Sequence, residues 1–166
     1  AALSGTDVWR RFVVPESCTL ADLHRAIQVL FGWSGGRLHG FVVDGEVFGP
    51  EEEGGERAER ETSVSDLAAE GVTEFIYHYD YGAEWEIRLS ILHHHGTASA
   101  LRCLAGAGAA PPEHIGGVLR FRRFVSALRK GEGPERQTAL AELGPDFDAD
   151  AFDMDACNRA LGSLSQ

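Results

Sequence analysis

The segment from Phe75 to Ile91 constrains the fold of this chain most, because apolar and polar residues alternate on both sides of a Tyr81-Gly82 turn. Alternation with a period of two places the apolar side chains on one face of a β-strand. We therefore predict a β-hairpin with an apolar face in the core and polar groups at its tip. The apolar stripes are Phe75, Tyr77 and Tyr79 on the first strand, and Trp85, Ile87, Leu89 and Ile91 on the return strand.

The amino-terminal part predicts one strand followed by one helix. Residues 8–14 are rich in β-branched and aromatic side chains, and they stop at Pro15, which cannot donate to a strand ladder. Thr19 and Asp22 have the spacing of a capping box, and the apolar residues that follow recur at helical spacing. We therefore expect an amphipathic helix over residues 20–31.

A second hairpin and an acidic loop are predicted next. Residues 38–48 alternate around Asp44-Gly45, a dipeptide typical of hairpin turns, and this places His39 on the apolar face of its strand. From residue 49 to 63 the chain is rich in Gly, Pro and glutamate, with almost nothing to bury, so we expect an exposed and mobile loop. Residues 64–71 predict a short helix closed by glycine.

The carboxyl-terminal third predicts helices. Ala and Gly alternate between residues 105 and 112, which indicates a flexible lead-in, and apolar spacing then marks helices near residues 118, 134 and 154. Strands followed by helices indicate an α+β fold. We expect an antiparallel sheet packed against the helix of residues 20–31, with the helical third closing one side, in one domain of residues 1–166.

Composition disfavours several classes of partner. The formal charge of -11 repels phosphate backbones, so nucleic acid is disfavoured unless a local basic patch overrides the field. Three cysteines outside any Cys-x-x-Cys spacing indicate reduced thiols, and no apolar run reaches the roughly 20 residues that a membrane span needs. We therefore expect a soluble, cytoplasmic protein without a membrane partner. A protein or a small molecule stays open as partner.

Polar groups near the hairpin tip are the candidates for chemistry. Glu84 and Glu86 are two apart on a predicted strand, hence on one face, and Asp80 stands across the turn. Neighbouring carboxylates raise one another's pKa, as an acid–base catalyst requires. The catalytic candidates are His24, Asp80, Glu84 and Glu113, and the candidate metal ligands are His24, His39 and Asp80.

The same residues also have structural interpretations. His24 lies beside the apolar stripe of its helix and His39 shares an apolar face, so both fit hydrogen-bonded core histidines. Asp80 beside Gly82 fits a turn residue that caps backbone amides. No cofactor is firmly implied, although a divalent metal stays open. The candidate binding residues are His39, Tyr79, Tyr81, Trp85 and Glu86.

Motifs for covalent catalysis and nucleotide binding are missing from the sequence. The chain has no Gly-x-Ser-x-Gly elbow, and Gly106 and Gly108 lack the Lys-Ser/Thr that follows in a phosphate loop. One predicted helix is basic, but helical spacing scatters its charges and favours an ordinary solvated face over a nucleic-acid site. These charges are Arg120, Arg122, Arg123, Arg129 and Lys130.

Eight ordered segments span nearly the whole chain: Val8-Trp-Arg-Arg with Pro15, Thr19–His24, Phe31-Gly-Trp33, Leu38–Phe41, Tyr79–Glu86, Cys103–Gly106, Pro111–Gly117 and Phe147–Asp153. Their order and spacing resemble the plasmid pRiA4b ORF-3-like family, which includes transposon passenger proteins that carry the name resolvase. The resemblance implies a bacterial α+β protein of one domain associated with mobile elements. It implies no established activity.

The chain departs from the family pattern at positions that could carry chemistry. Ala83 and Ile87 stand where the family typically has Asp and His, and His114 and Ile115 stand where Asp and Cys are frequent. The resemblance thus implies that a polar or metal-binding centre, if the family has one, is altered here. We therefore predict a binding or interaction module; the alternative is a metal-assisted or acid–base hydrolase that uses a His/Asp/Glu cluster.

Overall fold

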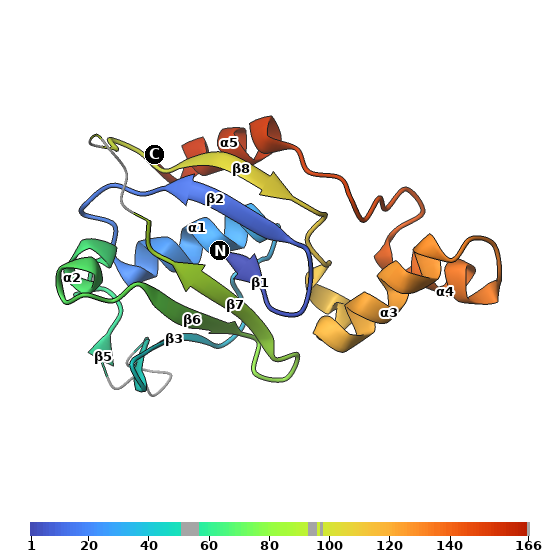
Figure 1. The fold of residues 1–166 in the computed structure, drawn as a ribbon, viewed down its shortest axis with the longest axis horizontal. Coiled ribbons are helices and arrows are strands. Elements are labelled where there is room, and N and C mark those ends of the chain that lie inside the picture. Colours follow the sequence, from blue (N-terminus) through green and yellow to red (C-terminus); the bar gives the residue numbers. More distant parts are fainter. Residues whose placement is uncertain (51–56, 93–95, 97, 166) are drawn as a thin grey trace.

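The computed structural model describes residues 1–50, 57–92, 96 and 98–165. Eight strands form one sheet, and helices occupy the connections and the carboxyl-terminal third (Figure 1). The strands are β1 Ala2–Leu3, β2 Trp9–Val13, β3 His39–Val43, β4 Glu46–Gly49, β5 Arg57–Ala58, β6 Glu74–Tyr79, β7 Trp85–Ser90 and β8 Arg102–Ala107. The helices are α1 Leu20–Phe31, α2 Val64–Ala69, α3 Val118–Arg129, α4 Pro134–Leu143 and α5 Met154–Gly162, with short 3-10 turns η2 Glu113–Ile115 and η3 Ser163–Ser165.

The sheet has the order β5-β4-β3-β6-β7-β1-β2-β8. Neighbouring strands are antiparallel except β4 and β5, which are parallel. Helix α1 covers one face, α5 lies beside β8, and α3 and α4 extend away from the sheet (Figure 1). The predicted α+β class and the predicted packing of the sheet on the first helix are therefore confirmed.

Helix α1 begins and ends where its sequence indicates. Thr19 and Asp22 form the capping box, because each side chain accepts a hydrogen bond from the other residue's backbone N–H. Gly32 ends the helix in the left-handed conformation that costs glycine no steric strain. The apolar stripe of α1 is fully buried and meets the aromatic face of the sheet in one core cluster.

Arg10 is a buried cation that ties three distant parts of the chain together. Its side chain is only 4% exposed. It donates to Leu30 O at the end of α1 (3.1 Å), to Trp9 O and Ala107 O (both 2.8 Å) and to Gly108 O (2.9 Å). Its guanidinium also lies over the rings of Phe31 and Phe152. These contacts join β2, β8, α1 and the approach to α5.

The outer edge of β8 is closed by side chains of the last segment. Asn158 on α5 accepts from Cys103 N at 2.8 Å and donates to Cys103 O at 3.0 Å, so one amide replaces a neighbouring strand. Phe152 covers Gly106 so closely that a Cβ there would lie 2.7 Å from the ring. An exposed strand edge invites pairing with other chains, and here that edge is capped.

Two sequence-based expectations are wrong. The predicted flexible lead-in after residue 105 is in part a strand, because residues 102–107 pair with β2. The predicted tight Tyr81-Gly82 turn is a five-residue loop over residues 80–84, which the Tyr79–Trp85 pair closes. Glu84 therefore lies outside the strand, with a positive φ of 53°, and does not share the strand face of Glu86.

The predicted exposed acidic loop of residues 49–63 differs from the structure at β5 and Glu59, whereas Arg60 and Glu61 are exposed as predicted. Residues 51–56 lie outside the described residues. Beyond them, β5 joins the sheet, and Glu59 is only 6% exposed because it enters the core side of β3. Among the described residues, no helix combines the length and apolar character needed to cross a membrane.

We predict that Arg10→Met lowers the free energy of unfolding by about 3 kcal/mol or more, because it leaves buried carbonyl oxygens without their donor. The exposed neighbour Arg11 supplies the matched control, and Arg11→Met should change stability by less than about 0.5 kcal/mol. Urea unfolding followed by circular dichroism measures both. Equal losses in the two variants would contradict the role given to Arg10.

Candidate functional site

Two histidines predicted as metal or catalytic residues are stacked between α1 and β3. The ring centroids of His24 and His39 lie 3.6 Å apart, with 15° between their planes. Nδ1 of His24 lies 2.7 Å from the hydroxyl of Tyr77 on β6, and Gln28, one turn along α1, donates to the same hydroxyl at 2.7 Å. The sequence named both histidines as candidates but did not single out Tyr77 and Gln28, the two groups that hold His24.

Hydrogen bonding defines the protonation of His24. Burial raises the pKa of Tyr77, so its hydroxyl stays protonated. Because Gln28 donates to that hydroxyl, Tyr77 donates its own proton to Nδ1 of His24, which leaves the His24 proton on Nε2. Burial, followed by the charge of His39, lowers the pKa of His24 to about 4. His24 is therefore neutral at neutral pH.

His39 is held by an acid that the sequence did not single out. Its Nε2 lies 2.9 Å from Oε2 of Glu59, and both side chains are 8% exposed. Glu59 comes from the segment whose composition predicted a solvated loop. No local sequence signal marks it, since the same segment has six glutamates and their register against β3 is set by tertiary structure.

Glu113, a catalytic candidate, joins three segments. Its Oε1 accepts from the Tyr79 hydroxyl and, at 3.0 Å, from the Ser34 hydroxyl, while Oε2 accepts from Ser34 N at 2.9 Å. Burial raises the pKa of Glu113, but these hydrogen bonds outweigh it and lower the pKa below its usual range. Glu113 is an ionised clamp between η2, the end of β6 and the loop after α1.

The carboxylates of the hairpin have separate partners. Oδ1 of Asp80 accepts from the N–H groups of Gly82 (3.1 Å) and Ala83 (3.3 Å), and its Oδ2 lies 3.8 Å from Arg37. Glu86 accepts from the hydroxyl of Ser4 at 2.6 Å. The structure therefore does not gather these acids into the cluster that sequence spacing indicated; Asp80 instead caps the turn.

The three candidate metal ligands do not converge. His24 and His39 stack face to face, which does not aim their nitrogens at one point, and Asp80 belongs to the hairpin turn. Within residues 1–50, 57–92, 96 and 98–165, no group of three or more His, Cys, Asp or Glu side chains is placed to hold a metal ion. Zinc sites take three or four such ligands.

The predicted binding aromatics differ in exposure. Tyr79 and Trp85 are fully buried, with Trp33 stacked on Tyr79 at a centroid distance of 5.1 Å, so these rings form core and present no surface to a partner. Tyr81 is 52% exposed, and its hydroxyl occupies the space where a Cβ of Gly40 would lie. His39 is buried as well, which leaves Tyr81 as the exposed aromatic of the predicted set.

Three loops that are distant in sequence meet at this end of the sheet. Leu38 O accepts from Asp80 N at 2.9 Å, Trp33 Nε1 donates to Pro111 O at 2.9 Å, and Gly117 approaches Ala83 so closely that a Cβ would lie 2.6 Å from its carbonyl oxygen. The junction therefore consists of residues 33–38, 80–84 and 111–117. Four of the eight segments that carry the family resemblance overlap it.

We predict that His24 makes the protein less stable in acid. Its pKa is about 4 when folded against 6.5 when unfolded, so only the unfolded chain binds a proton between these values. This part of the stability is fully present above pH 6.5 and is lost as the pH falls to 4. It amounts to about 2 kcal/mol after a discount for the partly exposed ring.

Denaturant unfolding between pH 4 and pH 7 measures this effect. His24→Gln should flatten the acid limb, because glutamine does not titrate there, whereas His114→Gln at an exposed position should retain it. An acid limb of the same slope in both variants would assign the proton uptake to another group.

Comparison with known proteins agrees with this architecture. Residues 2–156 match the family described as Plasmid pRiA4b ORF-3-like protein. An uncharacterised protein of Sinorhizobium fredii, y4hQ, is 31% identical over 166 residues, which cover 95% of this chain and 85% of that protein. The crystal structure of a protein of unknown function from Methanosarcina mazei, MM3350, has a TM-score of 0.81 at 30% identity, over 93% and 92% of the two chains. This chain belongs to the plasmid pRiA4b ORF-3-like family.

Proposed function

We propose that this protein is a binding module that recognises a protein partner at the three-loop junction. The observation that carries the proposal is the exposure of three large apolar side chains on or beside the joined loops. Leu38 and Tyr81 are each 52% exposed and Leu119 is 77% exposed. We call these residues the tip surface. Exposed apolar anchors clustered within one region are typical of protein contact sites.

Hydrogen bonds that hold the three loops of the junction in place support the recognition of a protein partner. Glu113 clamps Ser34 to Tyr79, and Asp80 caps the turn that presents Tyr81. Because these polar groups are engaged within the protein, the apolar anchors are displayed on a pre-ordered frame. Pre-ordering reduces the entropy lost on association.

Two arginines adjoin residues of the tip surface in the sequence, Arg37 before Leu38 and Arg120 after Leu119. Arg37 is 61% exposed and Arg120 is 49% exposed, each within 4 Å of one carboxylate of its own chain. A partner with apolar side chains at its centre and carboxylates at its rim would complement them. Such rim charges affect association rate and specificity more than affinity.

A hydrolase is the second candidate, and the stacked histidines favour it. His39 with the buried acid Glu59 has the pairing of a base and its orienting carboxylate. An argument against a hydrolase is that Nδ1 of His24 and Nε2 of His39 already form hydrogen bonds within the core, to Tyr77 and Glu59. This alternative requires that His24→Gln abolishes hydrolysis of an ester or phosphoester reporter, and that Tyr81→Ser does not.

A photocrosslinking residue at position 81 tests the binding proposal in cells of the source organism. We expect one discrete protein adduct at position 81 and none at position 9, where Trp9 on β2 is 37% exposed and belongs to none of the three loops. Leu119→Asp should abolish the adduct without changing the melting temperature, because Leu119 is largely exposed.

Two outcomes would contradict the proposal. One is equal crosslinking from positions 81 and 9, which indicates non-specific contact. The other is an adduct at position 81 that persists in the Leu119→Asp variant, which places the contact outside the tip surface.

We also infer one domain for residues 1–166, since all eight strands belong to one sheet with α1 and α5 packed on it.

A further inference from the structure

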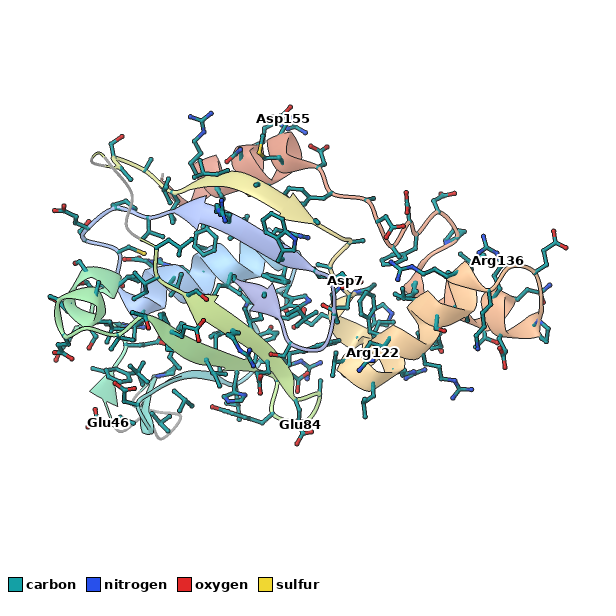
Figure 2. The ribbon with its side chains drawn as sticks, in the orientation of Figure 1. Asp7, Glu46, Glu84, Arg122, Arg136 and Asp155 are labelled. Carbon is teal, nitrogen blue, oxygen red and sulfur yellow. The ribbon has the colours of Figure 1, made fainter. Side chains whose placement is uncertain are left out.

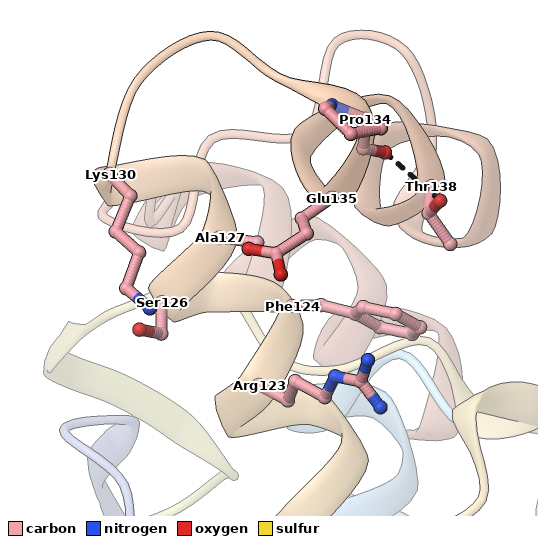
Figure 3. A pocket seen from close by; sticks show the side chains of 8 residues that line it. All are labelled: Arg123, Phe124, Ser126, Ala127, Lys130, Pro134, Glu135 and Thr138. Carbon is pink, nitrogen blue, oxygen red and sulfur yellow. Dashed lines mark hydrogen bonds between the residues drawn. The ribbon is translucent and has the colours of Figure 1, made fainter.

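An open cavity of about 300 Å³ lies between α3 and α4, away from the junction. Helix α3 lines it with Arg123, Ser126 and Ala127, the C-cap residue Lys130 follows, and α4 lines it with Pro134, Glu135 and Thr138 (Figure 3). Phe124 completes the lining and is largely buried. Small side chains at the facing positions, Ala127 above all, leave this space between the helices unfilled.

The cations of α3 divide into two groups. Arg120 pairs with Glu142 at 3.0 Å and Arg129 pairs with Asp150 at 2.8 Å, and these bonds brace α3 against the segment that follows it. Arg123 and Lys130 line the cavity, and in the described part of the chain neither has a carboxylate within 4 Å. The lining thus holds two cations and one acid, Glu135, and neither cation forms an ion pair within 4 Å among the described residues.

The hydrogen-bond donors that line the cavity are of the kinds that bind oxyanions. A guanidinium offers a planar fork that binds carboxylate or phosphate through two hydrogen bonds, and an ammonium adds a point charge. Ser126 also lines the cavity, and its side chain lies beside that of Lys130 (Figure 3). Phe124 and Ala127 offer an apolar surface for the rest of a ligand.

We propose that the α3–α4 cavity binds a small organic anion through Arg123 and Lys130. At roughly 30 Å³ for each water molecule, the cavity has room for about ten waters, which exceeds a lone inorganic ion and suits a small organic molecule. The ligand therefore bears at least one carboxylate or phosphate on a compact body. This site is independent of the tip surface.

The carboxylate of Glu135 opposes the binding of an anion in this cavity. Its side chain points from α4 into the space between the helices, with Lys130 and Ser126 on one side and Arg123 and Phe124 on the other (Figure 3). A carboxylate there attracts the two cations and repels an incoming anion. Glu135→Gln therefore strengthens binding, whereas loss of either cation weakens it.

Isothermal titration of the whole chain at low ionic strength tests this site, with pyrophosphate and citrate as separate probes for phosphate and carboxylate chemistry. We expect one saturable site for at least one probe. Arg123→Gln and Lys130→Gln should each weaken it roughly tenfold, the effect of one charge-assisted contact. Arg122→Gln is the matched control, because Arg122 of the same helix lies near Gly5 and outside the cavity.

The probes and variants distinguish the outcomes. Saturation by pyrophosphate alone assigns phosphate-bearing ligands, and saturation by citrate alone assigns carboxylates. Equal weakening by Arg122→Gln and Arg123→Gln would indicate diffuse attraction to α3 and overturn the site. Lack of saturation by both probes, or Glu135→Gln without a gain in affinity, would overturn it too. Circular dichroism of each variant confirms that the fold is retained.

Discussion

The buried guanidinium of Arg10, which has no carboxylate partner among the described residues, holds α1 to the β2–β8 edge of the sheet. Burial opposes the charge of Arg10 and lowers its pKa, yet backbone carbonyls and two aromatic faces surround it. Those carbonyls belong to α1 and to both strands at one edge of the sheet. Because a buried charge is costly unless every donor is satisfied, α1, β2 and β8 keep their relative positions. Figure 2 shows the described side chains on the sheet and the helices.

The other end of the sheet is ordered by a chain of neutral and acidic groups. Gln28 and Tyr77 orient His24, His39 stacks on it, and Glu59 brings β5 to the sheet. Glu113 then fixes the loops around Tyr79. The polar residues that resemble a catalytic set thus form a scaffold, and the groups they leave exposed lie at the hairpin tip and on α3. This division of roles is the basis of our proposal that the protein recognises a partner at its surface.

Local patterns predicted the elements whose signals are local. The capping box of Thr19, the Asp44-Gly45 turn and the alternation from Phe75 onward each determine structure within a few residues, and each is confirmed. Strand β8 was missed because its Ala and Gly have low strand propensity, and pairing with β2 overrides that preference. Glu59 was missed because its partner His39 is twenty residues away. The stacking of His24 on His39 likewise depends on how α1 lies over β3, which spacing alone does not encode.

The side-chain amide of Asn158 protects the edge strand β8 from pairing with another molecule. It occupies the one pair of outward backbone groups at Cys103 that a strand from another molecule would use first. Residue 158 lies beyond the match to the family, which ends at residue 156. A version cut at that boundary would keep every strand and lose this amide, which leaves the N–H and C=O of Cys103 open to pairing with another chain.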